Sequence, residues 1–282
     1  TILFNSNNGV YKDVVVSTGD TNIAPYTLTV TNGNIAVAKT YDGTTAVADG
    51  NVTGKLGYTN PSFGDELFIT YTGAAYNDAS VAGASKVTFS GLKLEGAKAA
   101  NYKLNVTSFD VAAKISKASL TIKAKDNTIT YGDTPHDNGF TVVSGLCGND
   151  KDDVVSGVTY TYNYTQNGNV GSYIITPAGG TADNYEVTGY ETGTLTVSPK
   201  ALTADAIAAI DAVTYNGKAQ APALNVVDGT KVLTADTDYT AVYSNNTNAG
   251  TAKVVITGKG NYSGTAEQTF TINKKPVTGT SG

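Results

Sequence analysis

The 282-residue sequence contains no tryptophan and no methionine, and it has a single histidine, His136, and a single cysteine, Cys147. One cysteine excludes an internal disulfide framework and a zinc site built from several cysteines. His136 lies in a turn-forming stretch without the strained turn that presents a catalytic serine, so no Ser-His-Asp triad is indicated. A catalytic pair cannot be chosen among 24 acidic residues without geometry. We therefore expect the chain not to be an enzyme.

Charge and long apolar runs are also scarce. Charged residues make up 15% of the chain, the net charge is −5, and the basic residues form no cluster. Binding to a phosphate backbone depends on such a cluster, so nucleic acid is not an expected partner. The longest apolar stretches fall well short of the roughly 18 residues that a membrane helix needs, so no membrane insertion is expected. Thr1 opens no signal-peptide pattern, and we expect any export signal to lie outside this sequence.

The residues that are abundant indicate strands and turns. Threonine, glycine, asparagine, valine and tyrosine dominate, and a hydrophobic content of 40% suffices to bury small cores. In residues 158–164, Val158, Tyr160, Tyr162 and Tyr164 alternate with polar residues, which is the period-2 pattern of a half-buried strand. The alanine-rich stretch 204–212 favours helix by propensity but occupies an entry-strand position, so we expect it to be extended. The sequence predicts an all-β fold.

Four landmarks recur three times in the same order, which indicates internal repeats. They are a Thr-Tyr turn with Asp, Asn or Gly, a tyrosine followed seven positions later by glycine, an Asn-Tyr pair, and an exit strand followed by lysine. The turns begin at Thr40, Thr130 and Thr214, the Tyr-to-Gly loops span 76–83, 164–171 and 243–250, the Asn-Tyr pairs are 101–102, 184–185 and 261–262, and the exit strands end at Ile115, Val197 and Ile272. Exit residues lie about 80 residues apart, the size of an immunoglobulin-like sandwich.

This spacing predicts three tandem immunoglobulin-like β-sandwich modules, which we call the first repeat (31–117), the second repeat (118–200) and the third repeat (201–275). Only two or three residues separate each exit strand from the next entry strand, which favours an extended rod. Residues 276–282 form a tail that parallels the start of a repeat, so the chain is expected to be part of a longer array.

Residues 1–30 form a separate N-terminal strand segment with apolar runs at 2–4 and 10–16. Such runs must be buried, because an exposed unpaired strand promotes aggregation. Three explanations stay open: the end of a preceding module, a first strand packed on the first repeat, or a donor strand that completes a neighbouring subunit.

These residues resemble known families. Residues 35–117, with AKTYDGTTAV and an Asn-Tyr end, resemble the YDG domain, and residues 118–200, with ITYGD and NVGSYIITPAGG, resemble the MBG (mostly β, glycine-rich) domain. Residues 201–275 are similar to a related repeat of bacterial surface proteins. The resemblance implies large exported bacterial proteins, often adhesins, in which such modules are stalk units, and it implies no catalytic residues.

Acidic loops are the only candidate metal sites. Asp150, Asp152 and Asp153 form one cluster and Asp236 and Asp238 another, and both offer the hard oxygen ligands that calcium prefers. Neither matches the EF-hand spacing with its distal glutamate. We treat them as weak calcium candidates and otherwise expect solvated turns and no cofactor.

The residues suggest two further kinds of chemistry, glycan stacking and an isopeptide bond. Tyr160, Tyr162 and Tyr164 could stack on a host or cell-wall glycan, but their shared face with Val158 is more simply a core face. Lys39 could enter an intramolecular Lys-Asn isopeptide bond, but no Lys, Asn and acid trio recurs among the landmarks.

We therefore expect an extracellular stalk or spacer of a bacterial surface protein or adhesin, which projects a functional tip from the cell. Its partners would be neighbouring modules of the same protein. The alternative is a subunit of an extracellular fibre or pilus, assembled from identical copies by β-strand donation.

Overall fold

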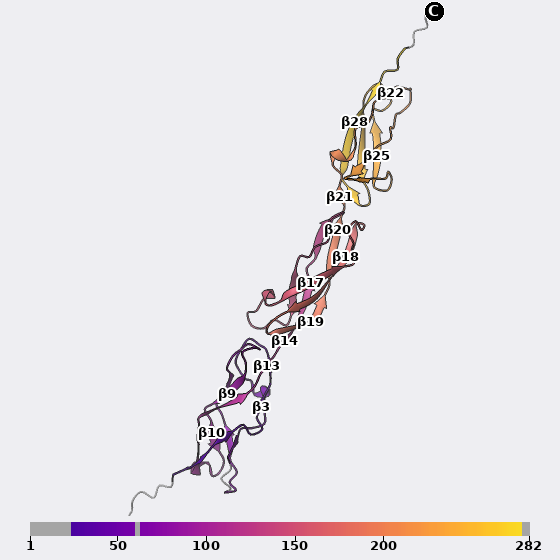
Figure 1. Ribbon diagram of the computed structural model, residues 1–282. Coiled ribbons are helices and arrows are strands. Elements are labelled where there is room, and N and C mark those ends of the chain that lie inside the picture. Colours follow the sequence, from indigo (N-terminus) through magenta and orange to yellow (C-terminus); the bar gives the residue numbers. More distant parts are fainter. Residues whose placement is uncertain (1–23, 60–62, 278–282) are drawn as a thin grey trace, which may run out of the picture. The chain divides into compact units, whose positions relative to one another are not determined.

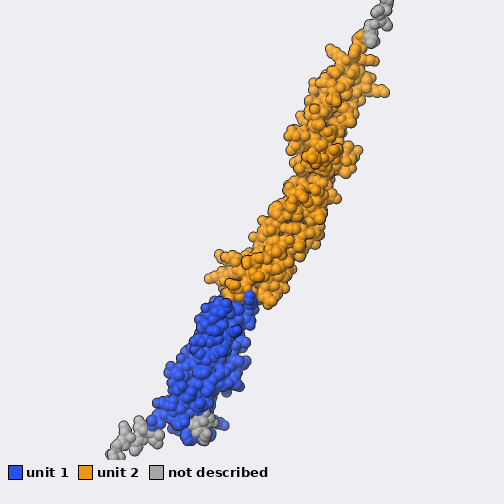
Figure 2. Space-filling model, in the orientation of Figure 1, with its two compact units in different colours: residues 1–118 blue, residues 119–282 orange. Residues whose placement is uncertain are grey.

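The computed structural model describes residues 24–59 and 63–277 (Figure 1). Within those ranges the chain forms 28 strands and four short 3₁₀ helices and no α-helix, so the fold is all-β, as predicted. In the same part of the chain, no helix is long and apolar enough to cross a membrane. The chain divides into two compact units, residues 1–118 and residues 119–282 (Figure 2).

Unit 1 consists of short strands. Its elements are β1 (Tyr26–Leu28), β2 (Val30–Thr31), β3 (Ala36–Val37), β4 (Lys39–Thr40), η1 (Asp49–Asn51), β5 (Val52–Thr53), β6 (Gly57–Tyr58), β7 (Phe68–Thr70), β8 (Gly73–Tyr76), β9 (Lys86–Ser90), β10 (Lys93–Glu95), η2 (Ala99–Asn101), β11 (Tyr102–Leu104), β12 (Ser108–Ala112) and β13 (Ile115–Ser116).

Unit 1 combines one antiparallel sheet with smaller strand pairs. The sheet has the order β12-β9-β8, and β4 pairs with β13 and β1 with β11, both in parallel. The pairs β7 with β10, β2 with β6 and β3 with β5 are antiparallel. Leu28, Val87 and Phe89 are fully buried, and the ring of Tyr71 contacts that of Phe89 edge to face.

Unit 2 has longer strands. Its elements are β14 (Ala118–Ala124), which starts at the boundary with unit 1, β15 (Asn127–Thr130), β16 (Phe140–Ser144), η3 (Asp152–Val154), β17 (Ser156–Tyr162), β18 (Gly171–Thr181), β19 (Tyr185–Glu191), β20 (Gly193–Ser198), β21 (Lys200–Ala201), η4 (Ala204–Ala206), β22 (Val213–Thr214), β23 (Val227–Asp228), β24 (Lys231–Val232), β25 (Tyr239–Ser244), β26 (Gly250–Gly258), β27 (Tyr262–Ser263) and β28 (Thr265–Asn273).

Two four-stranded sheets form the bulk of unit 2, with the orders β15-β20-β18-β17 and β22-β28-β26-β25. A three-stranded sheet, β16-β14-β19, and the pairs β21 with β27 and β23 with β24 complete it. One cluster of buried side chains runs from the second repeat into the third: it includes Leu195 and Val197 as well as Val226 and Ile256. The two repeats of unit 2 therefore share a core.

The landmark turns and exit strands meet in the same way in all three repeats. The turn strand pairs in parallel with the exit strand: β4 with β13, β15 with β20 and β22 with β28. The tyrosine that follows each turn strand donates its N–H to a carbonyl at the end of the exit strand: Tyr41 to Ser116, Tyr131 to Ser198 and Tyr215 to Asn273, at 2.8 to 2.9 Å. The nearby glycines 43, 132 and 217 have φ values of 79°, 95° and 80°, which explains the need for glycine in these turns.

The structure confirms most of the strand predicted at 158–164. Of the stretch 158–164, residues 158–162 lie in β17, with Val158, Tyr160 and Tyr162 half-buried and the alternate threonines exposed. In the stretch 204–212 the structure differs in one detail. Residues 204–206 form the 3₁₀ turn η4, after which Ile207 bridges to Val226.

Part of the N-terminal segment packs on the first repeat. β1 pairs in parallel with β11, and Leu28 and Val30 are 0% and 4% exposed. The apolar runs at 2–4 and 10–16, which motivated the donor-strand hypothesis, lie outside the described residues, as does the end of the C-terminal tail, 278–282.

Candidate functional site

The tyrosine of every Asn-Tyr landmark is tied to an aspartate far upstream. The hydroxyl of Tyr102 donates to Asp65, that of Tyr185 to Asp150 and that of Tyr262 to Asp228, across 37, 35 and 34 residues. All three tyrosines are buried. Each bond ties the aspartate to the start of the Asn-Tyr strand across the connection between them. We call these contacts the Tyr–Asp pairs.

The environment of the Tyr–Asp pairs keeps the phenols protonated. The hydrogen bond to the Asp65 carboxylate, with a smaller effect of burial, raises the pKa of Tyr102 to about 12. Burial raises the pKa of Tyr262 to about 12, and burial together with the bond to Asp150 raises the pKa of Tyr185. A neutral phenol that donates to a carboxylate is the stable state at neutral pH.

In unit 2 the third Tyr–Asp pair is part of a larger cluster between two repeats. Lys231, on β24 of the third repeat, donates from Nζ to the hydroxyl of Tyr131 in the second repeat at 3.0 Å. The same ammonium lies 5.2 Å from the ring centroid of Tyr131 and 5.3 Å from that of Tyr262. The two rings meet edge to face with centroids 5.5 Å apart. We call Tyr131, Lys231 and Tyr262 the junction cluster.

Electrostatics favour a charged lysine and neutral tyrosines in the junction cluster. The hydrogen bond to Tyr131 raises the pKa of Lys231 despite its partial desolvation. A cation over two aromatic faces is attracted by their quadrupoles, by about 0.5–1 kcal/mol per ring at exposed sites. The cluster therefore holds a turn of the second repeat against the Asn-Tyr strand of the third without a covalent bond.

Asp228 connects the junction cluster to the strand that enters the third repeat. Its Oδ1 accepts from Lys200 Nζ at 2.6 Å, and its Oδ2 accepts from the Tyr262 hydroxyl at 3.3 Å. Lys200 opens β21, which pairs in parallel with β27. One carboxylate thus fixes both the entry strand and the Asn-Tyr strand.

Asn261, the partner of Tyr262 in the landmark, reaches the second repeat as well. Its Oδ1 accepts from the N–H of Val170 at 2.8 Å, and its Nδ2 donates to Oδ1 of Asn169 at 2.9 Å. Val170 and Asn169 belong to the Tyr-to-Gly loop 164–171. The Asn-Tyr landmark of one repeat therefore binds both the turn and the loop of the repeat before it.

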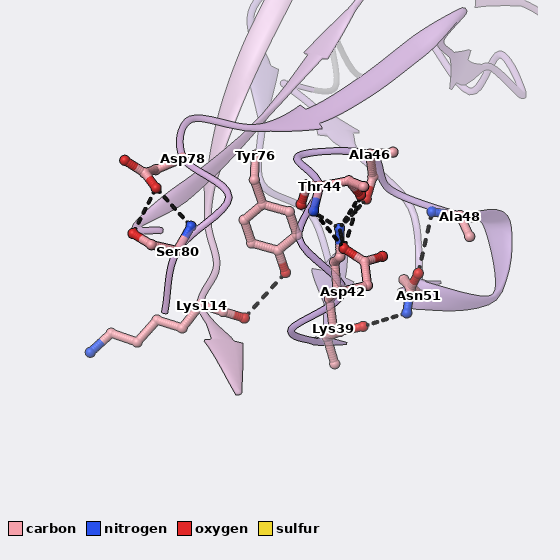
Figure 3. Close-up of polar contacts among 11 residues, drawn as sticks. Lys39, Asp42, Thr44, Ala46, Ala48, Asn51, Tyr76, Asp78, Ser80 and Lys114 are labelled. Carbon is pink, nitrogen blue, oxygen red and sulfur yellow. Dashed lines mark hydrogen bonds and ion pairs between the residues drawn. The ribbon is translucent and has the colours of Figure 1, made fainter. Parts of the chain in front are cut away.

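Unit 1 has a different lysine cluster, at the YDG turn (Figure 3). Lys39 is 6% exposed, and its Nζ donates to the carbonyls of Thr44 and Ala46 at 2.7 Å each. It also forms an ion pair with Asp42 at 2.8 Å and lies 5.8 Å from the ring centroid of Tyr76. Desolvation alone would raise the pKa of Asp42, but Lys39 and the two Thr44 donors outweigh it and lower that pKa.

The surroundings of Lys39 bear on the isopeptide hypothesis. Asn51, the asparagine in Figure 3, uses its side chain elsewhere: Nδ2 donates to the carbonyl of Ala38, and Oδ1 accepts from the N–H of Ala48. The acceptors of Lys39 Nζ are Asp42, Thr44 and Ala46. The described structure thus places Lys39 against a turn rather than against an asparagine amide.

The first calcium candidate cluster does not come together as a ligand set. Asp150 accepts from Tyr185, and Asp152 accepts from the N–H of Val142 at 3.0 Å. Asp153 lies in the 3₁₀ turn η3 with Asp152. The carboxylates of Asp150 and Asp152 each close a loop.

The second candidate cluster is similar. Asp238 is buried and accepts from the N–H of Thr234 at 2.9 Å, while the carbonyl of Asp236 accepts from Lys259 Nζ at 2.6 Å. In the described part of the chain, no group of three or more His, Cys, Asp or Glu side chains is arranged to hold a metal ion.

The candidate glycan platform points inward. Tyr164 is 4% exposed and contacts Tyr173 edge to face, and the half-buried Tyr160 and Tyr162 pack against the core of unit 2. These rings fill the core face that their spacing predicted.

The landmarks of the sequence include the tyrosines of these clusters but not Asp65, Asp228 or Lys231. A usable signal exists for the aspartates. Each one stands within two residues of a glycine and 34 to 37 residues before the landmark tyrosine. Lys231 has no such signal.

Comparison with protein-family models finds two domains in the chain. Residues 5–109 match the YDG domain, and residues 120–196 match the MBG domain of the YGX type. The matches follow the predicted order and contain the turns at Tyr41 and Tyr131. No curated protein matches the chain.

Proposed function

We propose that this chain, in which a YDG domain precedes an MBG domain, is a stalk segment of a bacterial extracellular surface protein or adhesin. In this proposal the three repeats are tandem immunoglobulin-like β-sandwich modules that form an extended rod and hold a functional tip away from the cell. Both domain types are consistent with a surface or adhesin-like protein. The observation that carries the proposal is the junction cluster of unit 2.

A spacer needs joints that resist bending, and the junction cluster supports this. Lys231 and Asn261 bind the preceding repeat at its turn and at its Tyr-to-Gly loop, two separate points. The backbone contributes as well, because Lys200 and Leu202 donate to the carbonyls of Asn261 and Ser263 at 3.0 and 2.8 Å. A flexible linker would be rich in glycine and serine and would make few contacts. This joint is instead built from strands and a shared core.

The proposal assigns the chain a mechanical role and gives it no catalytic residue, metal or cofactor. Its partners are the neighbouring modules of the same protein. The aspartates that suggested calcium are engaged in loops, and the tyrosines that suggested a glycan face the core. Their polar and aromatic groups therefore serve the folding of each repeat.

The stiffness of the joint is testable by pulsed electron paramagnetic resonance on the full chain. Spin labels at the exposed Thr161 in β17 and Thr240 in β25, in a Cys147→Ala background, report the distance across the joint. We expect a narrow distance distribution that broadens in Lys231→Ala. Lys253→Ala, which removes a surface ion pair with Glu267, is the matched control and should leave the distribution narrow.

Two results would contradict the proposal. One is a distribution that is already as broad in the parent chain as in Lys231→Ala. The other is a compact envelope in small-angle scattering, since a stalk must be elongated. Filaments that form from the full chain and disappear when residues 1–23 are deleted would favour the fibre subunit instead.

A further inference from the structure

The exposed end of the third repeat resembles the end of the second repeat that contacts the third. We propose that this end face, made of Tyr215, Asn248, Ala249 and the segment 274–277, is a docking surface for a further repeat. The inference deepens the proposed stalk function and rests on it. It names the partner by its chemistry: a repeat that presents an Asn-Tyr pair and a lysine, as Asn261, Tyr262 and Lys231 do.

Landmark positions establish the equivalence residue by residue. Tyr215 occupies the turn position of Tyr131, since each follows the threonine of its turn strand. Asn248 and Ala249 stand five and six positions after the loop tyrosine, as Asn169 and Val170 do. In the second repeat, the Tyr131 hydroxyl accepts from Lys231. The N–H of Val170 donates to Asn261, and the side-chain oxygen of Asn169 accepts from Asn261.

The same residues line an open groove in the third repeat. A groove of about 450 Å³ is bordered by Tyr215, Asn248, Ala249 and residues 274–277. Tyr131, which is covered by the third repeat, is 7% exposed, whereas Tyr215 is 37% exposed. The groove therefore lies where a following repeat would place its lysine and its Asn-Tyr pair.

The segment that leaves the third repeat, 274–277, supports the same partner. Val277 lies five positions after Ile272, as Leu202 lies five positions after Val197. Leu202 is 8% exposed inside the third repeat, but Val277 is 94% exposed. In the second repeat this segment continues into β21, which pairs with the Asn-Tyr strand β27. An apolar side chain at the Val277 position thus has a place in the core of an incoming repeat.

An extended chain tests the proposal directly. It continues after Lys275 with a second copy of residues 201–282, so that Lys275 takes the place of Lys200 at the new joint. Spin labels at Thr240 in the third repeat and in the appended repeat report the distance across that joint. We expect a distribution as narrow as the one across the natural joint, because the same groups meet.

Two variants remove opposite sides of the contact. Tyr215→Ala in the third repeat alone, and Lys231→Ala in the appended repeat alone, should each broaden the distribution. The second variant leaves the docking face intact, so it stays informative if Tyr215→Ala perturbs folding. Tyr215→Phe, which keeps the ring and loses the hydroxyl, should broaden it less. Lys253→Ala in the third repeat is the control and should have no effect.

The outcomes separate this inference from the stalk proposal. A broad distribution at the new joint beside a narrow one at the natural joint would overturn the docking surface and leave the stalk intact. Broad distributions at both joints would overturn both. A narrow distribution that neither variant changes would also overturn the inference. So would self-association of the unextended chain that Tyr215→Ala abolishes, because the occupant would then be a second copy.

Discussion

Lys39 in unit 1 and Lys231 in unit 2 each place an ammonium over a tyrosine ring, yet they organise different lengths of chain. Lys39 is buried, its hydrogen bonds and its ion pair reach no more than seven positions along the chain, and its ring contact, Tyr76, lies in the same repeat. It therefore stabilises the inside of one repeat. Lys231 lies at the surface and reaches Tyr131, 100 residues earlier, so it joins two repeats. The same cation–tyrosine contact thus stabilises the inside of a repeat in unit 1 and the joint between two repeats in unit 2.

Both units have Tyr–Asp pairs, and high pH should weaken both units through these pairs more than any substitution below. The pKa values of Tyr102 in unit 1 and Tyr262 in unit 2 are both raised to about 12, above an ordinary value of 10.0. A raised folded-state pKa adds stability that is complete below pH 10 and is lost as the pH rises towards 12. We expect both units to lose stability in this window, as followed by circular dichroism and by tyrosinate absorbance.

Phenylalanine variants separate the two units in that titration. Tyr102→Phe should weaken the pH dependence of unit 1 and Tyr262→Phe that of unit 2, as read from hydrogen exchange by mass spectrometry. Stability that stays constant between pH 10 and 12 would contradict the role of the Tyr–Asp pairs.

The next largest effect is the loss of unfolding free energy that follows removal of Lys39, which should be confined to unit 1. Lys39→Met keeps the aliphatic stem but removes two charge-assisted bonds to the carbonyls of Thr44 and Ala46. We expect unit 1 to lose about 3 kcal/mol of unfolding free energy, with unit 2 unchanged, in denaturant-dependent hydrogen exchange. Lys86→Met, which removes an exposed ion pair with Asp110, is the control and should cost below about 1 kcal/mol. Equal losses in both variants would remove the distinction between a buried and a surface lysine.

A smaller effect is expected for the coupling free energy between Lys231 and Tyr131 at the joint. In a double-mutant cycle, Lys231→Met and Tyr131→Phe should couple by about 1 kcal/mol, the size of one net hydrogen bond. Tyr131→Phe keeps the edge-to-face contact with Tyr262, so the coupling isolates the hydroxyl. The readout is the exchange protection of unit 2. A coupling indistinguishable from zero would mean that Lys231 does not join the repeats energetically.

The smallest effect is that of salt. Lys200 and Asp228 form an ion pair with side chains 44% and 23% exposed, so about 1 M salt should screen it. We expect unit 2 to lose less than about 0.5 kcal/mol from this pair. The Lys200→Met variant should lose this part of the salt response of unit 2, whereas the part that comes from the exposed pair of Lys253 with Glu267 stays. The contribution of Lys39 to the stability of unit 1 should persist in salt, because Lys39 is shielded from solvent. A large loss of that contribution in salt would contradict the difference between the buried lysine and the joint.

Local chemistry explains why much of the fold was predictable. The turns at Tyr41, Tyr131 and Tyr215 depend on neighbouring Asp, Asn and Gly residues, and period-2 patterns mark strands such as β9 and β17. Both signals lie within a few residues of the feature they predict. The all-β class and the inward-facing tyrosines followed from them.

The clusters were not predictable, because their residues lie far apart in the sequence. Asp65, Asp150 and Asp228 precede their tyrosines by 37, 35 and 34 residues. So wide a spacing, with a nearby glycine in a glycine-rich chain, becomes a usable signal only once one of these contacts is known. Lys231 gains its role from a residue in another repeat, and a sequence pattern gives no sign of that contact. At residues 204–206 alanine propensity suggested helix and position suggested strand, and the chain forms a single 3₁₀ turn.

The parallel pairing of turn strand and exit strand has a consequence for force. Each repeat has such a pair, β4 with β13, β15 with β20 and β22 with β28. When two parallel strands are pulled from the start of the earlier one and the end of the later one, they slide along each other. Their hydrogen bonds then carry the load together rather than breaking one after another. Under tension from its two ends, each repeat should yield abruptly and at a higher force than a hairpin that unzips.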